Sequence, residues 1–207
     1  QKAATEAVRE TEGQILCQNG EAVEAYYFST SAGVTSTDEI WGSDEAAPYL
    51  RSVPCKFDEE EPWSSWIVEL PWKMLEDRIR EKGEGTVLRS VTVTRRSESG
   101  AATALEAVSD KDSCIIENEY EIRKFLAPVN CMITEKDGTE TAGGSLLPSA
   151  YFELERTQNG NLQVRGKGYG HGVGMSQTGA DKMAEQGYDY REILDYFFRN
   201  ITVENLG

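Results

Sequence analysis

The segment GKGYGHGVGMSQTGA, residues 166–180, places glycine at every second position from 166 to 174 and carries the chain's only histidine, His171. Side chains alternate between the two faces of an extended strand, so this spacing predicts a strand with one face of bare backbone. Each glycine costs roughly 0.5–1 kcal/mol relative to alanine. We therefore expect another segment, or a ligand, to lie close against the bare face.

The spacing of these glycines differs from that of two well-defined motifs. A dinucleotide-binding G-x-G-x-x-G opens a helix, whereas these glycines keep a period of two. A nucleophile elbow needs G-x-S-x-G, and the interval from Gly174 to Gly179 around Ser176 is one residue too long. His171 therefore keeps two interpretations, a buried hydrogen-bond anchor or a residue that touches a ligand.

Charge and hydropathy exclude several classes of partner. The 207 residues include 36 acidic and 21 basic side chains, which gives a net charge of −15. Such a surface repels phosphate backbones and anionic lipids, so we expect no nucleic-acid partner. No apolar run approaches the ~20 residues of a membrane span. A membrane anchor is therefore expected only outside this chain, which begins without methionine and looks cut from a longer protein.

The cysteines give no sign of a metal site. The four cysteines, Cys17, Cys55, Cys114 and Cys131, are far apart in the sequence and form no C-x-x-C pair. With a single histidine they offer no cluster of ligands, so we expect neither a metal nor another cofactor. Disulfides and buried free thiols both stay open.

Periodicity and turn signals predict an α+β fold with a mixed or antiparallel β core, flanking helices and an inserted small α/β subdomain. Helices are expected at residues 2–12, 72–80, 120–126, 177–186 and 191–199. Strands are expected at 14–17, 21–27, 64–70, 86–94, 101–108, 114–116, 131–134, 150–155 and 162–165. Asn19-Gly20 and Asn159-Gly160 mark hairpins. We assign residues 1–60 and 129–207 to the core and 61–128 to the insertion.

A second unusual segment, FSTSAGVTST at residues 28–37, has a hydroxyl group on six of its ten side chains. Small hydroxyl residues bond nearby backbone and compete with regular strands, so a structured loop is expected. With Trp41 and Tyr49 following, the loop suits a surface that binds sugars. An ordinary serine- and threonine-rich loop is the alternative.

Residues 168–180, with 183–187 and 190–194, closely resemble the closing signature of the SpoIID/LytB family, the stage II sporulation protein D and amidase-enhancer proteins. Other segments that resemble the family lie at residues 7–8, 11–14, 25–35, 41–42, 48–53, 121–126 and 147–152. Two positions depart from the family pattern, because Val34 stands where a glycine is usual and Thr178 where an aromatic residue is common. The resemblance covers nearly the whole chain.

This resemblance implies a protein that acts on peptidoglycan. The sporulation branch resembles lytic transglycosylases, which cleave the glycan strand between N-acetylmuramic acid and N-acetylglucosamine. In these enzymes one carboxyl group protonates the glycosidic oxygen and then helps the C6 hydroxyl attack the anomeric carbon, giving a 1,6-anhydro sugar. The family's proposed catalytic glutamate lies in a helical segment that nothing in this chain matches. We therefore expect no cleavage by these residues alone. The alternatives are a peptidoglycan-binding module that enhances a cell-wall amidase, and an inactive secreted scaffold.

The family's function also implies a location and a set of candidate residues. Peptidoglycan as the partner places the protein outside the cytoplasm. We expect Ser29, Ser31, Thr35, Trp41 and Tyr49 to line the walls of a groove for glycan strands, with no catalytic residue among them. The remaining substrate-binding candidates are Tyr169, His171, Ser176 and Gln177.

Overall fold

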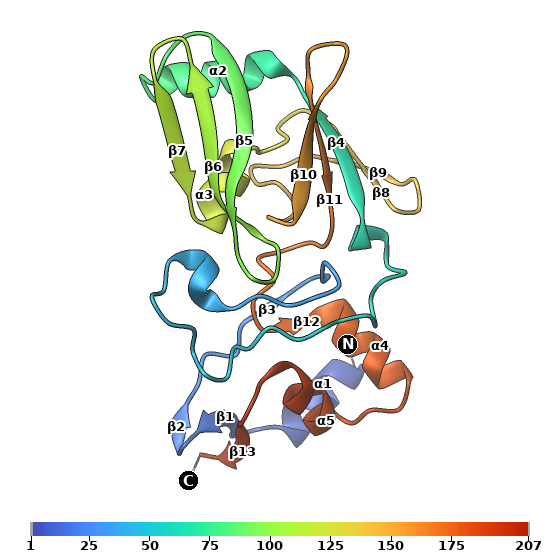
Figure 1. The fold of residues 1–207 in the computed structure, drawn as a ribbon. Coiled ribbons are helices and arrows are strands. Elements are labelled where there is room, and N and C mark those ends of the chain that lie inside the picture. Colours follow the sequence, from blue (N-terminus) through green and yellow to red (C-terminus); the bar gives the residue numbers. More distant parts are fainter. Residues whose placement is uncertain (1, 207) are drawn as a thin grey trace.

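The computed structural model describes residues 2–206 and confirms the α+β fold (Figure 1). The described residues form five α-helices: α1 (Lys2–Glu10), α2 (Trp72–Glu81), α3 (Glu119–Phe125), α4 (Gln177–Glu185) and α5 (Tyr190–Phe197). Two 3-10 helices, η1 (Asp38–Trp41) and η2 (Pro62–Ser64), add single turns. All five α-helices lie where the sequence predicts them, which confirms that their periodicity and caps are local signals.

The described residues also form thirteen strands. They are β1 (Gln14–Gln18), β2 (Glu21–Ala22), β3 (Tyr27–Phe28), β4 (Trp66–Leu70), β5 (Leu88–Arg96), β6 (Ala102–Ser109), β7 (Ser113–Glu117), β8 (Met132–Glu135), β9 (Glu140–Ala142), β10 (Phe152–Arg156), β11 (Leu162–Gly166), β12 (Met175–Ser176) and β13 (Thr202–Asn205). Their sheets have the orders β10-β11-β4-β8-β9, β5-β6-β7, β13-β1-β2 and β12-β3. Every pair is antiparallel except β12 with β3.

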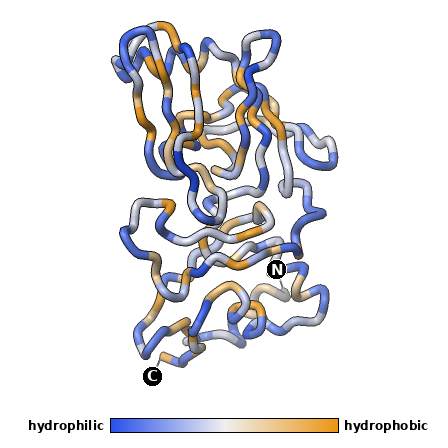
Figure 2. The backbone as a smooth tube through the Cα atoms, in the orientation of Figure 1, coloured by the Kyte–Doolittle hydropathy of each residue, from blue (hydrophilic) through white to orange (hydrophobic). Residues whose placement is uncertain are grey.

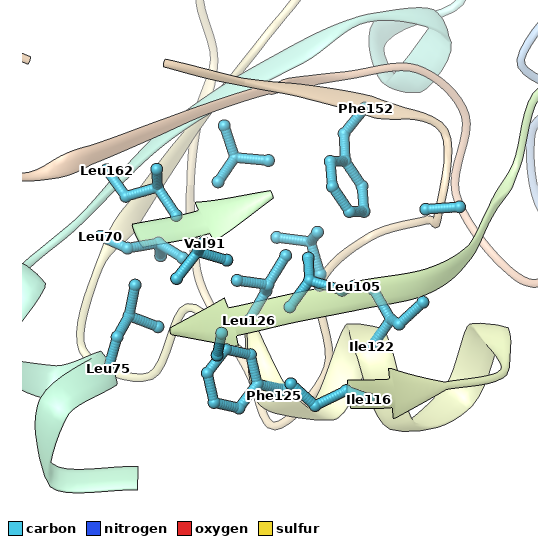
Figure 3. Close-up of a cluster of buried hydrophobic side chains, with 14 of the residues drawn as sticks. Leu70, Leu75, Val91, Leu105, Ile116, Ile122, Phe125, Leu126, Phe152 and Leu162 are labelled. Atoms are coloured by element: carbon cyan, nitrogen blue, oxygen red, sulfur yellow. The ribbon is translucent and has the colours of Figure 1, made fainter. Parts of the chain in front are cut away.

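The larger hydrophobic core lies between the five-stranded and three-stranded sheets and is completed by α2 and α3 (Figures 1 and 3). Strand β4 alternates buried and exposed side chains, so Trp66, Val68 and Leu70 face this core. Figure 3 shows Leu75 from α2 and Phe125 from α3 pointing into the same cluster. Fully burying a large apolar side chain contributes about 1.5–3 kcal/mol. The cluster therefore fixes β11, paired with β4, as the rigid support of the glycine segment that follows it.

The smaller core joins irregular loops to the two C-terminal helices. Ile40 of η1, Leu50 and Val173 pack there against Met183 of α4 and Phe197 of α5. Helix α5 begins with the expected capping box. Figure 2 shows hydrophilic residues at most loop tips and hydrophobic ones along the strands of the larger core. The glycine segment connects the two cores, since Gly166 ends β11 of the larger core and Ser176 is the N-cap of α4, which packs in the smaller one.

The strand expected at residues 21–27 is wrong in extent. Asn19 and Gly20 form the predicted turn with positive φ at both positions. The pairing with β1 then ends after Ala22, and Tyr27 and Phe28 pair instead with Met175 and Ser176. A partner more than a hundred residues away therefore overrides the local strand signal.

Strand β4 belongs to the expected insertion at 61–128 but lies between β11 and β8 of the expected core. The division into domains stays a prediction.

Candidate functional site

The glycine segment is not the flat strand that its period of two predicts. Gly168, Gly170, Gly172 and Gly174 all have positive φ, from 75° to 113°. Residues with a Cβ rarely adopt this backbone conformation, whereas glycine adopts it without a steric clash. The alternation therefore marks a repeated left-handed backbone conformation, and only Met175 and Ser176 at the end of the segment form a strand.

The expected close approach to the glycines is nevertheless present, and the approaching segment is the hydroxyl-rich loop. The backbones of Thr30 and Tyr169 exchange two hydrogen bonds, with N–O distances of 2.8 and 3.1 Å. A Cβ on Gly168 would lie 2.8 Å from the carbonyl oxygen of Thr30, and one on Gly174 would overlap the carbonyl oxygen of Tyr26. Backbone contacts therefore join the glycine segment to the hydroxyl-rich loop and to Tyr26, which precedes it.

A buried carboxyl group, Asp58, joins these segments a second time. Its Oδ2 accepts hydrogen bonds from the Ser31 amide at 2.8 Å and from the Ser176 hydroxyl at 2.6 Å. The Ser31 hydroxyl donates to Oδ1 at 2.7 Å, and the Thr178 hydroxyl donates to Oδ2 at 3.3 Å. Asp58 is fully buried and forms no ion pair within residues 2–206. Burying a charge without a counterion requires such hydrogen bonds, so Asp58 holds the loop against the start of α4.

Sequence reasoning missed Asp58, because it begins the run Asp58-Glu59-Glu60-Glu61, in which nothing distinguishes it from solvated neighbours. The structure therefore gives a different role to two residues that were predicted to bind substrate, Ser31 and Ser176. The hydroxyls of Ser31 and Ser176 are buried and donate to Asp58. Ser176 also accepts the amide hydrogen of Gly179 as the N-cap of α4. Both hydroxyls therefore maintain the shape of the site.

His171 lies in an aromatic cluster with Trp41 and Phe28. Its ring centroid is 5.2 Å from that of Trp41 and 5.8 Å from that of Phe28, both edge-to-face. Its Nδ1 accepts the amide hydrogen of Val173 at 3.1 Å, which places the proton of the neutral ring on Nε2. Burial lowers the pKa of His171, and a backbone hydrogen bond with Tyr27 opposes this shift. Both sides of the imidazole meet backbone, which favours the hydrogen-bond anchor over a sugar contact.

The remaining candidates are dispersed. Thr35 is fully buried, and its hydroxyl accepts the amide hydrogen of Val53 at 2.9 Å. Tyr49 packs against the smaller core, where burial raises its pKa. Tyr169 is exposed and stacks edge-to-face on Trp63 at 4.6 Å. Ser29 is half-buried and Gln177 exposed. The structure thus brings Ser31 and Ser176 together at Asp58, where the backbone carbonyl of Ser29 also accepts the Ser176 hydroxyl, and it brings Trp41 and His171 together in the aromatic cluster.

A hollow of about 290 Å³ opens where the hydroxyl-rich loop meets the beginning of the glycine segment. This loop hollow is lined by Ser31, Gly33, Glu59, Ser65, Lys136 and Lys167, among others. Of the predicted site residues only Ser31 lines it, and its hydroxyl is already bonded. The exposed polar groups in the loop hollow are instead residues that the sequence did not single out, above all Lys167.

Comparison with known proteins supports the relationship that these segments suggest. Residues 51–174, more than half of the chain, match the family described as a domain of unknown function, DUF8618. The chain is 31% identical over 202 residues to stage II sporulation protein D of Bacillus amyloliquefaciens, and 30% identical over 203 residues to the protein of that name in Bacillus subtilis (strain 168). It is 23% identical over 230 residues to the amidase enhancer of B. subtilis. The chain belongs to the SpoIID/LytB family.

This SpoIID/LytB chain corresponds to only part of its relatives. The matches to the two sporulation proteins cover 98% of the chain but 51% of each relative, and the match to the amidase enhancer covers 32% of that protein. The chain therefore spans about half the length of the sporulation relatives that it matches.

The buried carboxyl groups of the SpoIID/LytB chain already have partners. Asp58 takes the hydroxyl network, and Glu119 binds the guanidinium of Arg123 at 2.5 Å. Glu135 accepts the hydroxyl of Thr141 at 2.5 Å. Within residues 2–206 these are the only buried acidic side chains, and each is engaged by another residue of the chain. The described part of the chain also contains no group of three potential metal ligands, and none of its helices is long and apolar enough to cross a membrane.

Proposed function

We propose that this chain is the glycan-binding core of a protein that processes peptidoglycan outside the cytoplasm. One observation carries the proposal: the hydroxyl-rich loop and the glycine segment are hydrogen-bonded side by side and share the loop hollow. A hollow with hydroxyl and charged groups on a rigid support suits a polar polymer such as a sugar chain. The relatives named for sporulation and for amidase enhancement support a role at the cell wall.

The reaction we propose for the complete protein is lytic transglycosylation. It requires a carboxyl group that acts first as acid and then as base at one glycosidic bond, unlike the paired carboxyl groups of hydrolases. The buried carboxyl groups of Asp58, Glu119 and Glu135 are engaged in hydrogen bonds or an ion pair. Since nothing in this chain matches the segment that carries the family's proposed catalytic glutamate, we propose that the acid comes from outside these 207 residues and that this chain holds the strand.

The second candidate is a binding module that enhances a partner amidase, and the relative named amidase enhancer favours it. This module would use the same loop hollow but would need no acid. The absence of an available buried carboxyl group in residues 2–206 is compatible with both candidates, so only products can separate them.

Mass spectrometry of glycan digests tests the proposal. The complete protein is incubated with purified peptidoglycan, and the soluble products are compared with those from Asp58→Ala, in which the loop is released from α4. We expect 1,6-anhydro-muramic products from the complete protein and few from the variant. Strand binding without such products, together with stimulation of an amidase, would establish the enhancer instead. Failure of the complete protein to sediment with peptidoglycan would refute both candidates.

A further inference from the structure

Two further hollows adjoin the loop hollow, and Lys167 lines all three. The tyrosine hollow, about 290 Å³, is lined by residues that include Val34, Ser99, Tyr151 and Arg96. The sheet hollow, about 420 Å³, lies over the end of β4 and β11 and is lined by residues that include Ile67, Thr134 and Arg165. Lys167 therefore stands where three depressions meet, directly after the last residue of β11.

The cations around these hollows differ in how they are paired. Arg96 binds Glu153 at 3.0 Å and Lys136 binds Glu60 at 2.9 Å, while Arg165 lies 3.8 Å from Glu155. Lys167 forms no ion pair, and its ammonium group makes no hydrogen bond to the described part of the chain. Among the cations that line the three hollows, Lys167 is the one without an acidic partner in the described part of the chain.

Hydrogen bonds fix the backbone on both sides of Lys167, while its side chain is exposed. The Lys167 amide donates to the Tyr151 carbonyl at 2.9 Å, and its carbonyl accepts the Ser149 hydroxyl at 2.6 Å. The next residue, Gly168, donates its amide hydrogen to the Trp63 carbonyl, and its own carbonyl accepts the indole N–H of Trp66 at 2.8 Å. A side chain on a backbone fixed on both sides loses less entropy when it binds a ligand.

We propose that Lys167 recognises a carboxylate on the wall polymer that occupies these hollows. This inference rests on the proposed function and assigns the loop hollow a specific ligand group. A lone ammonium beside hydroxyl groups suits a single negative charge, whereas Glu59 and Glu153 in the same linings oppose a phosphate of higher charge. Peptidoglycan offers the carboxylate in two forms: a carboxylate of the peptide stem, or the lactyl carboxylate of a muramic acid whose stem has been removed.

Three forms of peptidoglycan, freed of anionic polymers, separate these sources. Intact sacculi carry stem carboxylates, amidase-treated strands carry lactyl carboxylates, and amidase-treated strands coupled to a neutral amine carry neither. The complete protein, its Lys167→Ala variant and Lys73→Ala are titrated against each form at low temperature and low salt. Lys73 is an exposed lysine of α2 paired with Asp77, so its substitution makes the same change in charge far from the hollows.

We expect the unaltered protein to bind one of the charged forms roughly three- to tenfold more tightly than the neutral form, the gain expected from a partly exposed charge-assisted contact. Lys167→Ala should lose this preference, and Lys73→Ala should keep it. The charged form that is bound more tightly identifies the source of the carboxylate. Equal binding of all three forms, or a preference that survives Lys167→Ala, would overturn the inference but leave the proposed function standing. Binding of none would instead refute the proposed function.

Discussion

Replacing Asp58 with alanine should destabilise the protein by about 3–5 kcal/mol, because this one carboxyl group joins the hydroxyl-rich loop to α4. The value follows from what its partners retain. The hydroxyls of Ser176 and Thr178 can still donate to the carbonyl oxygen of Ser29, at 3.2 and 3.0 Å. The Ser31 amide has no other acceptor among the described residues and is left unsatisfied. An orphaned buried N–H costs about 1–3 kcal/mol, and the lost charged hydrogen bonds and the cavity add the rest.

Urea denaturation of Asp58→Ala, Asp58→Asn and Glu60→Ala provides the test. Glu60 belongs to the same acidic run but is exposed and pairs only with Lys136, so its substitution should change the free energy of unfolding by no more than about 0.5 kcal/mol. Asp58→Asn keeps one acceptor oxygen and should fall between the two. A loss in Asp58→Ala no larger than that in Glu60→Ala would refute the assignment of Asp58 as the link between the segments.

Three further measurements test other parts of the structure. Gly174→Ala should lose roughly 2–5 kcal/mol of stability, since its Cβ would overlap a carbonyl oxygen. Gly138→Ala has a similar φ but open space around its Cβ, so it should lose only about 1–2 kcal/mol. Equal losses in urea denaturation would contradict the close approach. NMR titration of the chain's single imidazole should give His171 a pKa below its ordinary 6.5. The stability that the neutral ring contributes is therefore complete above pH 6.5 and declines as the pH falls toward the lower pKa of the folded state. A pKa at or above 6.5 would refute the burial of His171. Burial raises the pKa of Cys55 to about 12 and also raises that of Cys17, so alkylation of the native protein near pH 8 should spare both thiols. Rapid modification of either cysteine would contradict the burial of that thiol.

The sequence predicted those parts of the fold whose signals are local. The helix starting at Tyr190 carries its capping box within four residues, and the Asn19-Gly20 turn needs only its own backbone. Strand β3 could not be predicted, because Tyr27 pairs with a residue nearly 150 positions away. The glycine period was misinterpreted, since a period of two fits both an extended strand and a series of left-handed residues.

The candidate site was predictable as segments but not as side chains. The sequence singled out the hydroxyl-rich loop and the glycine segment, but the hydrogen bonds between them appear only in the structure. Which hydroxyls are free could not be predicted, because Ser31 and Ser176 are bonded to a carboxyl group distant from both in sequence. The importance of Lys167 depends equally on the absence of an ion pair, which only three-dimensional neighbours determine.

The central claim, that the loop hollow and its neighbours hold a glycan strand, is tested most directly by hydrogen–deuterium exchange of the complete protein with and without soluble glycan strands. We predict slower exchange at residues 29–34 and 166–178 when the strand is bound. The hollow between α2 and α3, lined by Arg78, Lys82 and Phe125 among others, should be unchanged. Protection confined to α2 and α3, with no change at the loop and glycine segments, would contradict the account.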